Sequence, residues 1–164
     1  MTLERDPVVD TAASLRVFAE QHASRQWRGF IGSLVTELET QIDLSDLVML
    51  LRRVGIRMAK ATPLPACSTL DELQAVINDI WASMDWGVME IREGEKLLTI
   101  VHIAYPHISA GVAATADWVV PVLEGVYTEW LNSQSGDMAF KARRSAATTA
   151  GSHAIEFVYG LLAE

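Results

Sequence analysis

The feature that most constrains the fold of this chain is a change in the spacing of its apolar residues. Over residues 27–84 they recur every three or four positions, which is the period of a helix packed on one side. Over residues 88–92 they alternate with charged residues, and residues 97–103 are apolar on both sides and rich in β-branched types. The helical period returns over residues 117–136. A chain that switches period in this way must pack helices against a sheet. We therefore predict an α+β domain, with helices on one face of a small antiparallel sheet.

Three of the predicted helices precede the sheet, and each has one apolar stripe that we expect to face the core. The stripes are Trp27, Phe30, Ile31, Leu34, Leu38 and Ile42; then Leu47, Leu50, Leu51, Val54 and Met58; then Leu70, Leu73, Ile77, Ile80, Trp81 and Met84. Ser45 is the expected N-cap of the second helix, and a capping box at residues 68–71 is expected to start the third. Pro63 and Pro65 end the second helix, and Gly55 leaves a flat spot that another backbone could approach. A short helix after Asp10 is also predicted.

The sheet is predicted from four segments. Residues 88–92 and 97–103 form a hairpin around a turn at residues 93–96, and the second strand is the more buried one. The segments MAFKARR and AIEFVYG near the end of the chain add two more strands, giving about four. Between the hairpin and these two late strands lies the long helix of residues 117–136, with Pro121 in its first turn and Gly136 at its end.

Composition limits the classes of function. A length of 164 residues indicates one domain over residues 1–164, with residues 1–22 as a mobile or oligomer-forming extension. The net charge of −8 opposes binding to nucleic acid and to anionic lipid. We expect no membrane insertion, because no run reaches ~18 apolar residues, and no signal peptide, because Glu4, Asp6 and Asp10 stand where one would begin. The apolar share of 50% is high for a small monomer, which favours burial against other subunits.

No catalytic, metal or cofactor site is predicted. The four histidines, at positions 22, 102, 107 and 153, lack the spacing of a metal site, and we expect His102 to be structural and His107 to lie in a loop. Cys67 has no basic neighbours and is expected to pack as a neutral thiol. Paired carboxylates are the only hint of glycosidase chemistry, at Glu37/Glu39, Glu93/Glu95 and Glu124/Glu129. Glu124 is the least ordinary, because it lies on a helix that buries its stripe. We expect it to be satisfied by hydrogen bonds or by an arginine from another element.

The tryptophans invite a sugar-stacking hypothesis, but packing is the better interpretation. Trp27, Trp81, Trp118 and Trp130 lie on or beside apolar helical stripes, where aromatic rings serve a core or a subunit interface. Trp86, before Gly87, is expected to wedge into a helix–strand junction.

Many residues, in order, resemble one bacterial family. The matching positions are Arg53-Val54-Gly55, Met58-Ala59, Cys67, Leu73-Gln74, Asn78, Asp85-Trp86-Gly87, Ile100-Val101-His102, Pro106, Trp118, Pro121 to Gly125, Tyr127, Trp130, Ser133, Gln134 and Gly136. They run from about Trp27 to Gly136 and are similar to the D subunit of bacterial cellulose synthase. The chain departs from that pattern by its extra segment at residues 1–22, and the resemblance fades after Gly136.

The resemblance implies a non-catalytic scaffold of the cellulose secretion system, built as an octameric ring of four dimers that promotes crystalline cellulose assembly. Its implied partners are other copies of itself, a proline-rich companion protein, the cellulose synthase complex and glucan chains. Without a signal peptide, we expect the chain in the cytoplasm near the inner-membrane synthase; the periplasm, where the family is usually drawn, is the alternative. The N-terminal residues Arg16, Gln21, Arg25 and Trp27 become candidates for lining a glucan passage or contacting other subunits. Glu124 and Trp130 become candidates for interface or packing contacts.

A weaker resemblance extends to the ligand-binding fold of Golgi-transport and nitric-oxide-signalling proteins. It rests on Gly55-x-Arg57-Met58 after a helix, on Cys67 and on an apolar helix before the hairpin. It implies the alternative function of a small-molecule-binding or sensor domain with an internal apolar pocket.

Overall fold

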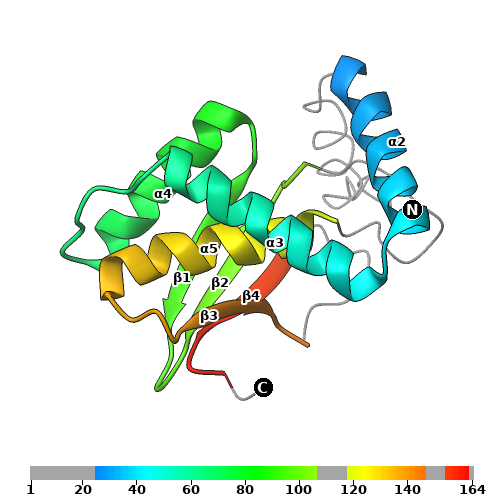
Figure 1. Cartoon of the computed structure of the whole chain (residues 1–164). Coiled ribbons are helices and arrows are strands. Elements are labelled where there is room, and N and C mark those ends of the chain that lie inside the picture. Colours follow the sequence, from blue (N-terminus) through cyan, green and yellow to red (C-terminus); the bar gives the residue numbers. More distant parts are fainter. Residues whose placement is uncertain (1–24, 107–117, 147–153, 163–164) are drawn as a thin grey trace, which may run out of the picture.

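The computed structural model describes residues 25–106, 118–146 and 154–162, with side chains from Trp27 onward. Its elements in chain order are α2 (Arg25–Gln41), α3 (Leu44–Ala61), α4 (Leu70–Met84), β1 (Val88–Glu93), β2 (Leu98–Ile103), α5 (Val119–Ser135), β3 (Lys141–Arg144) and β4 (Ala154–Gly160) (Figure 1). The short helix expected after Asp10, and His107, lie outside the described residues.

The four strands form one antiparallel sheet in the order β1-β2-β4-β3. The hairpin of β1 and β2 and the two late strands are therefore confirmed. The apolar strand β2 takes an interior place, as its composition predicts. The prediction of an α+β fold is confirmed; the resemblance to the wider ligand-binding fold stays a prediction.

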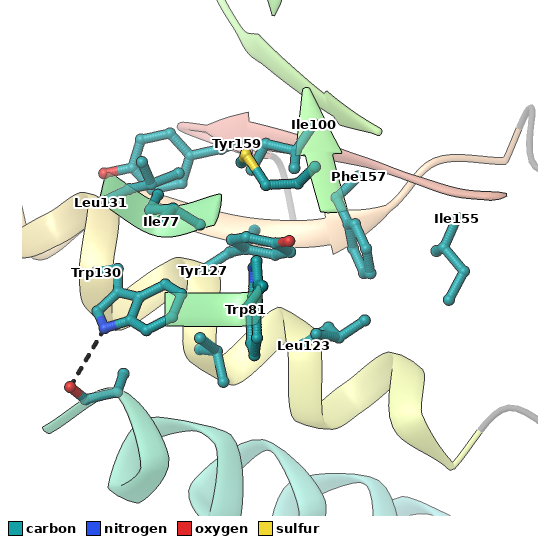
Figure 2. Packing of buried hydrophobic residues seen from close by; sticks show 14 of the residues in the cluster. Ile77, Trp81, Ile100, Leu123, Tyr127, Trp130, Leu131, Ile155, Phe157 and Tyr159 are labelled. Atoms are coloured by element: carbon teal, nitrogen blue, oxygen red, sulfur yellow. Dashed lines mark hydrogen bonds between the residues drawn. The ribbon is translucent and has the colours of Figure 1, made fainter. Parts of the chain in front are cut away.

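Helix α5 is the centre of the domain, because it lies between α3 and the sheet (Figure 1). Every residue from Val119 to Thr128 is buried, as expected for a helix enclosed on several sides. Figure 2 shows its side chains Leu123, Tyr127 and Trp130 meeting Trp81 of α4 and Phe157 of β4. Pro121 lies in its first turn, and Gly136 ends it with a φ of 71°, both as predicted.

Side chains of α4 and α5 form hydrogen bonds with backbone groups of the two edge strands, β1 and β3. On β1, Asn78 of α4 bonds both backbone groups of Met89, at 2.8 and 2.9 Å, and Gln74 accepts from the N–H of Ile91 at 2.7 Å. On β3, Thr128 of α5 accepts from the N–H of Ala142 at 2.9 Å. Backbone groups on both edge strands, which would otherwise need water, are thus paired within the domain.

Two predicted helix starts are displaced. The N-cap of α3 is Asp43 rather than Ser45, and its side chain makes no capping bond. For α4 the N-cap is Thr69, which accepts from the N–H of Glu72 at 3.1 Å, while the Glu72 carboxylate accepts from Ser68 N–H at 2.7 Å. The capping pair is therefore one residue later than predicted, and it has the usual glutamate instead of Asp71.

The apolar stripes of α2 and α3 are only partly buried, against the prediction. On α2, Trp27, Phe30 and Leu34 are exposed by 55, 57 and 45% of their surface. On α3 the buried row is Leu47, Leu51, Gly55 and Ala59, at intervals of four. Leu50 and Val54 stay about 40% exposed at its side. On α3 it is the row containing Gly55, and not the row of Leu50 and Val54, that lies against α5.

Candidate functional site

Glu124 is a buried carboxylate that joins three elements. It lies on α5 with only 5% of its surface exposed. One carboxylate oxygen accepts from Nε of Arg52 on α3 at 2.6 Å. The other accepts from the backbone N–H of Arg144 on β3 at 2.9 Å. Both oxygens thus have a partner, as expected.

The Arg52–Glu124 pair exists because α3 and α5 cross at their backbones. A Cβ at Gly125 would lie 2.1 Å from the carbonyl oxygen of Arg52, and a Cβ at Gly55 would lie 1.9 Å from that of Val122. Real Cβ atoms do not approach so closely, so each helix needs glycine at the crossing. The close backbone approach that Gly55 was expected to permit is therefore observed. It brings the backbone of Arg52 against Gly125, the residue after Glu124.

Arg143 lies close enough to this pair for both of its charges to act on it. Burial lowers the pKa of the Arg143 guanidinium, the neighbouring Arg52 lowers it further, and Glu124 opposes both effects. Adjacent arginines usually lie on a solvated face of a domain. Here Arg52 is only 30% exposed and is bonded to Glu124, and Arg143 is partly buried.

A groove of about 290 Å³ runs beside Glu124. Its walls come from the first turns of α3 and α5, with Leu44, Leu47 and Trp118 among them. Arg52, Glu124 and Arg144 add a polar wall. The groove can receive an apolar group that carries a polar end. Among the described residues that line it, none is a cysteine or a histidine.

His102 is enclosed by aromatic rings and serves the core. It is fully buried, and its two ring nitrogens lie 2.6 Å from the Tyr127 hydroxyl and 2.7 Å from the carbonyl oxygen of Trp86. A carbonyl can only accept, so Nε2 carries the proton and Nδ1 accepts from Tyr127. Burial lowers the pKa of His102 to about 4, with the Trp86 bond opposing the shift. The neutral ring is a structural link, which confirms the prediction for His102.

Trp86 connects this cluster to the sheet. Its ring stacks on Trp81 at 5.6 Å between centroids, and the chain around it takes left-handed φ values at Asp85 and Gly87. A Cβ at Gly87 would meet the backbone of Ile103 at 2.1 Å, so glycine is required there. Trp86 thus occupies the helix–strand junction, as expected.

The remaining chemical candidates do not converge. Glu129 faces Lys60 at 3.7 Å and Glu37 accepts from Gln41 at 3.0 Å, both on the surface. Burial and then Glu72 raise the pKa of the Cys67 thiol, which disfavours a reactive thiolate. Within residues 25–106, 118–146 and 154–162, no group of three or more His, Cys, Asp or Glu side chains could hold a metal ion. Across the same ranges, no helix is both long and apolar enough to span a membrane.

The N-terminal candidates are only partly placed. Arg16 and Gln21 lie outside the described residues, and Arg25 is described only as the first residue of α2. Trp27 is exposed and contacts Phe30 edge-on, with ring centroids 5.7 Å apart.

Trp130 is buried in the core. Its indole N–H donates to the carbonyl oxygens of Thr62, at 2.9 Å, and Ala59, at 3.3 Å, at the end of α3. Figure 2 marks the Ala59 bond with a dashed line.

Sequence reasoning missed the partners rather than Glu124 itself. Arg52 is 72 positions away in the chain, and the bonds of Gln74, Asn78 and Thr128 to strand edges have no local pattern. The paired glycines, Gly55 and Gly125, are the signal that could have indicated a close crossing of the two helices.

Comparison with known proteins places these residues in one family. Residues 13–160 match the family of the cellulose synthase D subunit, and this match extends beyond the resemblance at both ends. The cellulose synthase operon protein D of Komagataeibacter xylinus is 34% identical over 109 residues, covering 65% of this chain and 70% of that protein. The protein of the same name from Komagataeibacter sucrofermentans is 33% identical over the same shares. The chain belongs to the family of cellulose synthase D subunits.

Proposed function

We propose that this chain is a non-catalytic, self-associating accessory subunit of bacterial cellulose synthesis. Membership of the family gives the chain a role in cellulose synthesis. The observation that supports a non-catalytic role is the use of its buried polar side chains. His102, Glu124, Thr128 and Asn132 are the buried polar residues of the described part, and each makes hydrogen bonds inside the domain. A catalytic carboxylate or imidazole needs a free position for its substrate.

Self-association into an octamer of four dimers is the finer part of this proposal. The exposed apolar side chains of α2 and α3 support it, because a water-facing stripe of this kind marks an interaction surface. Light scattering on the purified chain tests it. We expect a mass of eight chains at micromolar concentration, and a stable monomer would overturn the oligomeric scaffold.

The cellular role is tested by complementation. We propose that the scaffold organises the cellulose synthase complexes together with a proline-rich companion protein, and that its contact with glucan chains is indirect. In a cellulose-producing bacterium whose own member of this family has been deleted, this chain should restore crystalline cellulose. Glucan hydrolysis by the purified protein that is lost in Glu124→Gln/Glu129→Gln would instead indicate an enzyme.

The groove beside Glu124 favours a second candidate, the binding of a small apolar molecule. A ligand of this site would raise the melting temperature of the protein. Screening amphipathic carboxylates by thermal shift tests it. Val48 also lines the groove, and Val48→Trp would fill it. A shift that persists in this variant would exclude this site.

A further inference from the structure

The two exposed apolar rows on α2 and α3 have matching geometry. On α2, Phe30 and Leu34 are four residues apart and more than 40% exposed. On α3, Leu50 and Val54 are also four residues apart and about 40% exposed. Residues at this spacing lie one turn apart on the same face of a helix. Each row can therefore lie against the other when two helices run side by side.

The first half of α2 stands away from the other described helices and strands. Leu38 and Ile42, near its end, pack against the small cluster around Leu47 and Leu51. The half that carries Trp27, Phe30 and Leu34 extends beyond this contact, as Figure 1 shows. An amphipathic helix takes most of its stability from packing of its apolar face. Trp27, Phe30 and Leu34 thus form an exposed apolar face that a second surface would stabilise.

The charges on the two helices identify that molecule as a second copy of the chain. Helix α2 has Arg28 in its first half and Glu37 and Glu39 near its end, an order that opposes its own dipole. Helix α3 has the reverse order, with Asp46 in its first turn and Arg53 and Arg57 in its second half. Two helices with opposite charge order attract each other when they lie parallel.

We propose that α2 of one copy lies parallel along α3 of a second copy, with the row of Phe30 and Leu34 on the row of Leu50 and Val54. Alignment of these rows places Glu37 of one chain opposite Arg57 of the other, since each is three residues further on. In a two-fold dimer the contact occurs twice, because the same surface on each chain is used. This inference rests on the proposed function and names the surface through which the dimers of that scaffold form.

The first test removes the apolar rows. Phe30→Ser/Leu34→Ser and Leu50→Ser/Val54→Ser should each raise the dissociation constant at least about ten-fold, as loss of central interface contacts does. The control is Met138→Ser, since Met138 is 68% exposed but lies far from both rows in the sequence. Its assembly should equal that of the wild type, and circular dichroism should show unchanged helix content in all variants. If both double variants assemble with the dissociation constant of the wild type, the proposed surface is wrong.

The second test exchanges the charges. Glu37→Arg and Arg57→Glu should each weaken assembly, and the two changes in one chain should restore it, because the opposed pair is then re-formed with reversed signs. Asp79→Arg, on the exposed face of α4, is the matched control for a charge reversal. Additive weakening in the double variant would refute the parallel alignment.

The mass of the wild-type assembly in solution distinguishes a wrong contact surface from a wrong scaffold function. If the wild type is an oligomer and the variants keep its size, the surface is wrong and the scaffold stands. If the wild type is a monomer, the scaffold itself is wrong.

Discussion

The Arg52–Glu124 pair predicts an asymmetry between its two partners. Glu124 has 6% of its side chain exposed and Arg52 has 30%. Arg52→Met leaves a buried carboxylate without its hydrogen-bonded cation, whereas Glu124→Gln leaves a guanidinium that reaches water. The arginine substitution should therefore destabilise the domain more than the glutamate substitution.

The magnitudes follow from burial. Removing one partner of a buried ion pair costs about 3–5 kcal/mol, so we expect this range for Arg52→Met. Glu124→Gln keeps an oxygen for the Arg144 N–H and loses one charge-assisted bond, which is worth about 1.5–3 kcal/mol at most. At about 2–4 °C per kcal/mol for a domain of this size, the melting temperature should fall by about 6–20 °C and about 3–12 °C respectively.

Urea unfolding followed by circular dichroism measures both values. All variants must be compared at one protein concentration, because assembly adds to the apparent stability. Arg53→Met is the matched control, since Arg53 is the exposed neighbour on the same helix. An equal or larger loss for Glu124→Gln would refute the reasoning from burial.

Three further outcomes are expected. Gly125→Ala forces α3 and α5 apart and should lower the free energy of unfolding by about 1–3 kcal/mol in urea, whereas Gly29→Ala, with open space around its Cβ, should not. Trp130→Phe removes the indole donor to Thr62 and should cost about 1–2 kcal/mol in the same assay. His102 has a pKa of about 4 in the fold against an ordinary 6.5. Between pH 6.5 and 4, His102 therefore binds a proton in the unfolded chain but not in the folded one. The free energy of unfolding should fall by about 3 kcal/mol as the pH drops through this range. The difference between wild type and His102→Gln across this range isolates that contribution, and a parallel pH dependence in the two proteins would contradict it.

Local patterns are sufficient to predict the elements and the interior place of one strand. Strand β2 lies inside the sheet, as its two apolar faces indicate, and α5 ends where Gly136 allows a left-handed turn. These features depend on neighbours in the sequence, which a single chain displays directly.

Contacts between distant segments are not predictable in the same way. The period of α2 identifies an apolar face but not the molecule that covers it, so the sequence gives no warning that Trp27 and Phe30 are exposed. The partner of Glu124 depends on how α3 and α5 cross, and that crossing is set by Gly55 and Gly125 together. Such pairs become visible only once the helices are placed in space.

The hydrogen bonds from α4 and α5 to the outer strands bear on the protein's resistance to aggregation. An open strand edge is a template on which another chain can add a strand, and stacked additions grow into fibres. Here amide groups of Met89 and Ile91 on one side, and of Ala142 and Arg144 on the other, are already engaged by helix side chains. The edges of the sheet are thus protected from strand addition when the protein is concentrated. Glu124 and Asn78 therefore also protect the sheet from pairing with strands of neighbouring chains.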